Sequence, residues 1–120
     1  MKPFGLGRPG TELRSQLVHA VLRGDKTATA GLPDDGAPPP SPGTRFTLHD
    51  VDDEPVGVVE VTEARVVPAA AIDVDFARDE GEGFESVEDW RLAHERFFER
   101  AIGPETQIVA IRFRVVEEVT

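Results

Sequence analysis

Two apolar runs separated by an acidic turn constrain the fold more than any other feature of this sequence. Residues 44–49 alternate, with Phe46 and Leu48 on one face, and residues 56–67 form a longer run rich in valine. Four acids and a proline lie between the two runs. Because alternation with a period of two is typical of strands that bury one face, the pattern predicts an antiparallel hairpin.

A third alternating run and two amphipathic runs accompany this hairpin. Residues 107–117 predict a last strand, whose apolar positions alternate with Arg112 and Arg114. Residues 11–23 predict a helix that Thr11 caps and Gly24 ends. A second long helix is predicted to begin after Ser86 and to end before Gly103-Pro104. Its residues at helical spacing are Trp90, Ala93, His94, Phe97, Phe98 and Ala101.

The remaining segments are short. Residues 26–31 suit a strand, residues 72–80 suit a helix, and residues 33–43 form a Pro-rich loop that cannot be a central strand. The predicted order is helix, short strand, hairpin, two helices and strand. Since few long helices separate the strands, we expect one α+β domain over residues 1–120, built on a small mixed β-barrel flanked by helices.

Composition narrows the possible partners. The 120 residues carry a formal charge of -10, which argues against unspecific binding to phosphate backbones. We therefore expect no DNA partner. The chain has no cysteine, no apolar run long enough to cross a membrane and no signal-peptide pattern at its N-terminus, so we expect a cytoplasmic protein without a membrane partner.

Lys26 and Thr29 lie three residues apart in the stretch that follows the first helix. A Lys-x-x-Thr pattern after a helix cap is usually a solvated turn. A threonine hydroxyl becomes a nucleophile only when a base or a cation activates it, and a lysine acts as a base only when its surroundings favour the neutral amine. From the local pattern both interpretations stay open.

Eight acids fall between Asp73 and Asp89. They are typical of a solvated helix and loop. In a second interpretation one carboxylate, Glu80, turns inward as a general acid or base, and the glycines at 81 and 83 permit the bend. A magnesium or calcium site is a third interpretation, although the spacing is not that of an EF-hand loop.

The aromatic residues of the last predicted helix allow two interpretations as well. Trp90, His94, Phe97 and Phe98 recur at helical spacing, which usually marks a core face. The same spacing also suits a pocket wall, in which His94 and Trp90 stack on a nucleobase.

Taken together, these motifs resemble the ASCH family, the domain named for homology to an activating signal cointegrator. The resemblance covers nearly the whole chain. Its motifs are Phe4-Gly5, the stretch Gly24-Asp25-Lys26-Thr27-Ala28-Thr29, Glu80-Gly81-Glu82-Gly83, Trp90-x-x-x-His94-x-x-Phe97-Phe98 and Val109-x-x-Arg112-Phe113. A basic residue often follows the threonine in this family, whereas Ala30-Gly31 follow it here.

The resemblance implies a PUA-like fold with a cleft and a link to RNA or its nucleosides. It implies two activities, amide hydrolysis and metal-dependent cleavage of RNA, of which we expect the first: an amidohydrolase that converts an N4-acetylcytidine-like amide to cytidine and a carboxylate. We expect no cofactor. Lys26, Thr29 and Glu80 take the catalytic roles. The expected substrate-binding residues are Phe4, Gly5, Gly24, Glu82, Trp90 and His94.

The alternative function is an RNA-binding module, which in one form is a metal-dependent ribonuclease that uses the acids at 73–82. The candidate RNA contacts are Arg23, Lys26, Arg45, Arg65, Arg112 and Arg114.

Overall fold

The computed structural model describes residues 1–33 and 39–118, and the long elements follow the predicted order. The observed elements are β1 (Lys2–Pro3), α1 (Glu12–Arg23), β2 (Ala28–Gly31), β3 (Arg45–His49), β4 (Pro55–Pro68), the 3₁₀-helix η1 (Ala69–Ala71), α2 (Val74–Asp79), α3 (Val87–Phe98) and β5 (Gln107–Glu118).

The five strands form one mixed sheet in the order β1-β3-β4-β5-β2. The predicted hairpin is the antiparallel pair β3–β4, β5 pairs antiparallel with both β4 and β2, and β1 pairs parallel with β3. Strands β1 and β2 are its edges, and within the described residues no pairing between them closes it. The α+β class is therefore confirmed, with a sheet that is open rather than a closed barrel.

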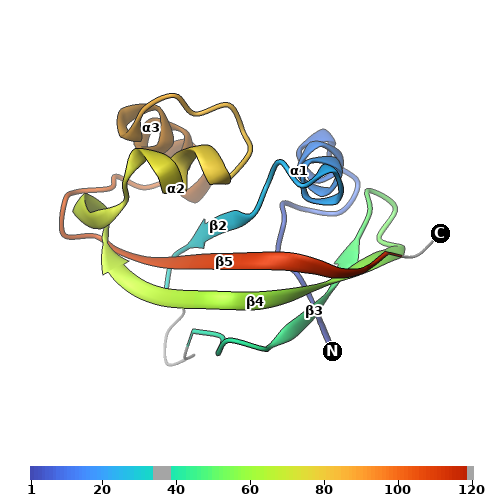
Figure 1. The fold of residues 1–120 in the computed structure, drawn as a ribbon. Helices are drawn as coiled ribbons and strands as arrows, with labels where there is room; N and C mark the ends of the chain where they lie inside the picture. The colour runs from blue at the N-terminus through green and yellow to red at the C-terminus, as the bar shows by residue number, and fades with distance from the viewer. Residues whose placement is uncertain (34–38, 119–120) are drawn as a thin grey trace.

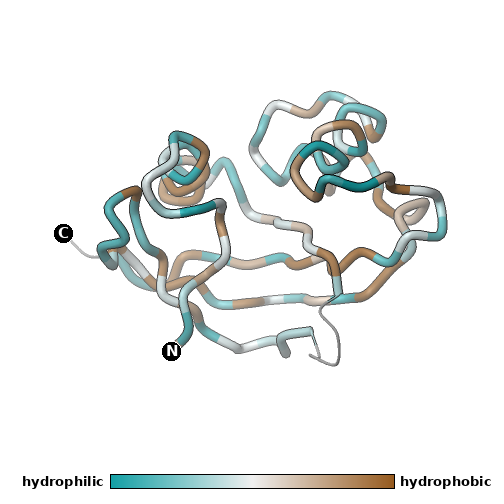
Figure 2. The backbone as a smooth tube through the Cα atoms, turned by 180° about the vertical axis from the view of Figure 1, so that it is seen from behind, coloured by the Kyte–Doolittle hydropathy of each residue, from teal (hydrophilic) through white to brown (hydrophobic). Residues whose placement is uncertain are grey.

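All three helices lie on one side of the long β4–β5 ribbon, and β2 passes between α1 and the α2–α3 pair (Figure 1). Two buried clusters fill the space beneath them. One cluster packs α1 and Phe4 against β3, β4 and β5 around Phe113, and the other packs α2 and α3 against β2 and β5 around Trp90. Hydrophilic and hydrophobic residues alternate around the helical turns in Figure 2, as expected for helices that bury one face.

The end of α1 determines where β2 begins. Gly24 adopts a left-handed conformation with φ of 83°. The backbone N–H groups of Gly24, Asp25 and Lys26 donate to carbonyl oxygens in the last turn of the helix. The oxygen of Ala20 accepts from Asp25 at 2.9 Å and from Lys26 at 3.0 Å. This cap turns the chain back against the end of α1, and Lys26 is buried rather than on the surface.

Some predicted boundaries were wrong. Helix α3 ends at Phe98, not at Ala101, because Glu99 adopts a left-handed conformation with φ of 57°. Strand β2 begins at Ala28 rather than at residue 26, and β1 and η1 were not predicted. Residues 34–38 of the predicted Pro-rich loop lie outside the described residues. None of the helices that the structure describes is long and apolar enough to cross a bilayer.

Candidate functional site

A cavity of about 240 Å³ lies between α1 and α3, with residues of β2 in its wall. It is slightly smaller than the roughly 300–1,000 Å³ of typical ligand sites, so it suits a small molecule. Its charged residues are Lys26, Glu80, Glu82, His94 and Arg96, and its apolar wall includes Leu13, Leu17, Phe84 and Phe97. The three residues that the family resemblance marks as catalytic, Lys26, Thr29 and Glu80, all line this one cavity.

Lys26 has only 2% of its surface exposed, although it carries a charge. Its Nζ donates to the carbonyl oxygens of Ala28, at 2.9 Å, and Glu80, at 3.2 Å. Two carboxylate oxygens complete the surroundings, from Glu80 at 3.6 Å and from Glu82 at 3.5 Å. Four acceptor oxygens around three N–H groups suit an ammonium ion, so Lys26 is a buried cation with a full set of partners.

Glu80 is the C-cap of α2 and is 1% exposed. Its two carboxylate oxygens face different partners. Oε2 accepts a hydrogen bond from the indole Nε1 of Trp90, whereas Oε1 lies 3.4 Å from Nε2 of His94 and 3.6 Å from Nζ of Lys26. Among the buried side-chain polar atoms that the structure describes, none lacks a hydrogen-bond partner. The carboxylate is therefore fixed in one orientation before any substrate binds.

Gly81 brings the Glu80 segment into contact with the Lys26 segment. It has φ of 70°, and a Cβ built on it would lie 2.5 Å from the carbonyl oxygen of Asp25 and 2.8 Å from Cα of Lys26. The sequence-based interpretation that glycine allows the bend at this point is therefore consistent with the observed backbone. Only glycine fits so close to a neighbouring backbone at this φ.

His94 is held by both of its ring nitrogens. Nδ1 lies 2.8 Å from the carbonyl oxygen of Trp90, which can only accept, so Nδ1 carries a hydrogen. Nε2 then faces the Glu80 carboxylate, and the ring stacks on the indole of Trp90 with centroids 4.4 Å apart. Burial lowers the pKa of His94, but the hydrogen bond and charge of Glu80 outweigh it, so the pKa lies above its ordinary value.

Glu82 lies on the solvent side of Lys26, and its side chain is 27% exposed. Burial raises the pKa of Glu82 above its ordinary value, and the nearby carboxylate of Glu80 adds to this effect, whereas the charge of Lys26 opposes it. The cavity thus holds two carboxylates in different surroundings, which is an arrangement that permits acid and base roles to separate.

Thr29 lies in β2 and lines the cavity. It lies opposite Ile111 in the antiparallel β2–β5 pair, and directly opposed residues project from the same face of a sheet. Thr27 precedes it by two residues, just before β2 begins, and is exposed outside this cavity. The two threonines of the motif therefore have different surroundings, and Thr29 is the one that lines the cavity.

The other predicted binding residues are distributed around this site. Gly5, Glu82 and His94 line the cavity with the three proposed catalytic residues, and Trp90 lies behind it, bonded to Glu80. Phe4 lines a neighbouring cavity and packs on Phe46 and Phe113. Gly24 caps α1 and does not line the cavity.

Sequence reasoning missed one prominent wall residue. Phe97 was grouped with the core face of the last helix, yet it is 55% exposed and lines the cavity. Leu13 of α1 is also partly exposed and lines the same cavity. The helical spacing could have shown that one of the two phenylalanines points away from the core, because Phe97 and Phe98 are adjacent and cannot both face it.

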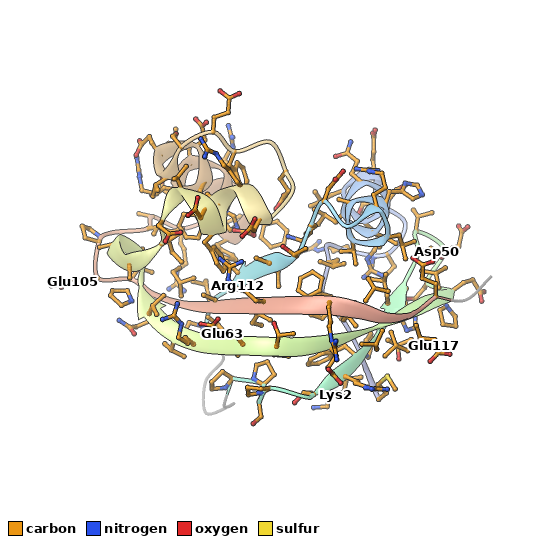
Figure 3. The ribbon with its side chains drawn as sticks, viewed as in Figure 1. Lys2, Asp50, Glu63, Glu105, Arg112 and Glu117 are labelled. Atoms are coloured by element: carbon orange, nitrogen blue, oxygen red, sulfur yellow. The ribbon has the colours of Figure 1, made fainter. Side chains whose placement is uncertain are left out.

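The six candidate RNA contacts all lie in ion pairs. Arg112 illustrates this: Figure 3 shows its side chain on the side of β5 that faces α2, where it donates to Asp79 at 2.7 Å and lies over the ring of Phe76. The other pairs are Arg23–Asp25, Lys26–Glu80, Arg45–Glu60, Arg65–Glu63 and Arg114–Glu60. Each positive charge that was assigned to phosphate recognition therefore has an acidic neighbour.

The acids at 73–82 do not assemble into a metal site. Within residues 1–33 and 39–118, no group of three or more His, Asp or Glu side chains is arranged to hold a metal ion. Asp73 instead caps α2, and Asp79 pairs with Arg112.

The family model of the ASCH domain matches residues 6–117, which is nearly the whole chain. The protein belongs to the ASCH domain family. A search of curated proteins found no significant match to it.

Solved structures agree with this assignment. The chain is similar to an ASCH domain from Lactobacillus crispatus, with a TM-score of 0.76 and 26% identity over 86% of this chain and 72% of the other. A protein from Enterococcus faecalis has the same fold, with a TM-score of 0.85 and 23% identity over 98% of this chain and 77% of the other. An ASCH protein from Zymomonas mobilis, studied as a mutant, has a TM-score of 0.56 and 16% identity over 88% of this chain and 69% of that one.

Proposed function

We propose that this ASCH domain is an amidohydrolase that acts on an acylated cytidine-type nucleoside. The observation that carries the proposal is the convergence of Lys26, Thr29 and Glu80, from three separate segments, on one cavity. A nucleophile, a buried cation and a buried carboxylate are the groups that acyl transfer from an amide requires.

In the proposed reaction, Oγ of Thr29 attacks the acyl carbon and its proton passes to the Glu80 carboxylate. The ammonium of Lys26 stabilises the negative charge that develops on the acyl oxygen. The C–N bond then breaks, Glu80 returns the proton to the leaving amine, and cytidine departs. Water hydrolyses the ester on Thr29 in a second step, which releases the carboxylate and restores the hydroxyl.

The surroundings of Lys26 favour this division of roles. Its Nζ contacts four oxygens, two of them from carboxylates, so it acts as a cation rather than as a base. Glu80 is held by Trp90 and faces His94, which sets its orientation towards the cavity.

The charge of the protein suits a neutral substrate. A nucleoside without phosphate needs no release of counter-ions, so a net charge of -10 does not oppose its binding. The half-exposed ring of Phe97 in the cavity wall offers a surface for stacking a base.

The test is a chromatographic assay of cytidine release from N4-acetylcytidine. We expect Thr29→Ala to lose at least 100-fold in kcat, and Thr27→Ala, on the neighbouring exposed threonine, to keep the wild-type rate. Equal rates for wild type and Thr29→Ala would refute the role of Thr29. Absence of release by folded wild-type protein would refute the proposed substrate.

RNA binding is the second candidate, supported by the link between this family and RNA and by the exposed ring of Phe97 beside Arg96 in the cavity wall. It predicts an affinity for short RNAs that falls steeply with salt. A titration that shows no binding at low salt would remove this candidate.

A further inference from the structure

A second cavity, of about 350 Å³, adjoins the first. The two cavities share Gly5, Thr29 and Ala30 in their walls, so the proposed nucleophile lies on the border between them. A substrate whose reacting carbon lies at Thr29 therefore has space on both sides of that carbon.

Strand register places the wall of the second cavity beside Thr29. Ile111 is directly opposite Thr29 on β5, and Val109, two residues earlier, is opposite Gly31 of β2 and Val66 of β4. Because residues two apart on a strand share a face, Thr29, Ile111, Val109 and Val66 project from the same face of the sheet. Phe46 of β3 also lines this cavity.

The chemistry of the two cavities differs sharply. The first holds Lys26, Glu80, Glu82 and His94. Among the described residues that line the second, Thr29 is the single one with a polar side chain, and the rest are aromatic, aliphatic, proline or glycine. One side of Thr29 is thus suited to an amine that must receive a proton, and the other side to a group that carries no polar atoms.

We propose that the second cavity binds the acyl group of the substrate, and that this enzyme prefers amides of apolar carboxylic acids of four or more carbons over acetyl amides. This inference rests on the proposed function. The leaving amine must lie near Glu80 in the charged cavity, so the acyl chain extends past Thr29 into the apolar one. An acetyl group would leave most of that cavity empty.

The expected preference follows from the burial of methylene groups. Each methylene transferred from water into an apolar wall raises kcat/KM by about fourfold. N4-butyrylcytidine should therefore be hydrolysed with a kcat/KM about 15-fold above that of N4-acetylcytidine.

Val66 provides the variant that separates acyl binding from catalysis. It is 43% exposed on β4 and lies in the wall of the second cavity, so Val66→Trp fills the space without opening the core. Val66→Phe fills less of it and serves as a second variant. Thr62→Trp is the matched control, because Thr62 is exposed on the same strand and does not line the cavity.

The experiment compares kcat/KM for the acetyl, butyryl and hexanoyl amides in wild type and these variants. We expect the gain with chain length to vanish in Val66→Trp, to shrink in Val66→Phe and to persist in Thr62→Trp, which should also keep the wild-type turnover of the acetyl amide. Turnover of the acetyl amide with no gain for longer chains would overturn the acyl-site proposal and leave the proposed function intact.

Calorimetric titration of the same amides into Thr29→Ala separates the two proposals if no amide is hydrolysed. Absence of hydrolysis of every amide would refute the proposed function. Affinity that rises with acyl length, and is lost when Val66→Trp is added, would still support an apolar acyl site. Affinity that does not change with acyl length would overturn that site too.

Discussion

Replacement of Gly81 by alanine should damage both the stability and the site, because Gly81 lies against the backbone that carries Lys26. A Cβ at this position would lie 2.5 Å from the carbonyl oxygen of Asp25, 2.7 Å from its carbonyl carbon and 2.8 Å from Cα of Lys26. All three are backbone atoms, so no side-chain rotation relieves the clash. The two segments must separate.

Gly83→Ala is the matched control. Gly83 also has a positive φ, of 84°, but a Cβ there would meet nothing within 4 Å. Both substitutions force alanine into a left-handed conformation, which costs about 1–2 kcal/mol, and both reduce the entropy of the unfolded chain equally. Gly81→Ala alone adds overpacking, which costs about 1–3 kcal/mol more.

These costs translate into unfolding temperatures. With an unfolding entropy of about 2.1 cal/mol/K per residue, each kcal/mol lowers the Tm of this domain by about 4 °C. We expect a loss of about 4–8 °C for Gly83→Ala and about 8–20 °C for Gly81→Ala in thermal unfolding followed by circular dichroism.

Activity offers a second readout. A displacement of about 1 Å between Lys26 and Glu80 should lower kcat for N4-acetylcytidine by about 100-fold in Gly81→Ala, measured below the Tm of the variant. Gly83→Ala should retain most of the wild-type rate. Equal losses of Tm in the two variants would refute the close approach of the Gly81 and Lys26 segments.

Two further predictions concern the buried charges. Lys26→Met should lower the free energy of unfolding, measured by urea titration, by about 3–5 kcal/mol. The double variant Lys26→Met/Glu80→Gln should lose less free energy of unfolding than the sum of the two single variants, because one buried charge without its partner is less stable than no buried charge. Losses that add up to that sum would contradict a buried pair. Glu80 raises the pKa of His94 in the folded protein above 6.5, the value of an unfolded histidine. The contribution of His94 to the free energy of unfolding is therefore complete below pH 6.5 and is lost as the pH rises through the pKa of the folded state. The imidazole NMR titration of His94 should give a pKa above 6.5 in wild type, and a lower one in Glu80→Gln; an unchanged value in that variant would contradict the pairing.

Local sequence patterns were sufficient to predict most of the elements. The hairpin, the caps of α1 at Thr11 and Gly24 and the alternation of the last strand all depend on neighbours a few residues apart. Such patterns also showed that Glu80 precedes glycines able to bend the chain. The end of α3 was not predictable in this way, because Glu99 adopts a left-handed conformation that its own type does not favour.

The motif and the family resemblance marked Lys26, Thr29 and Glu80 from the sequence alone, but not their relations in space. Residues 26 and 80 are joined by one hydrogen bond of side chain to backbone and by an ion pair across 54 positions of the chain. The sequence could not distinguish a solvated lysine from one that is 2% exposed, because burial depends on how α1, β2 and α2 pack together.

The sequence by itself therefore determined which side chains are available, where the helices are capped and which strand positions alternate, because these features depend on residues only a few positions apart in the chain. Only the tertiary structure decided that Lys26 is a paired, buried cation and that Phe97 lines a cavity instead of the core. It also decided that Thr29 lies between a charged cavity and a second one whose other described lining residues are all apolar. These properties arise from contacts between distant segments, and the energy of a charge or an apolar group depends on those surroundings more than on its neighbours in the chain.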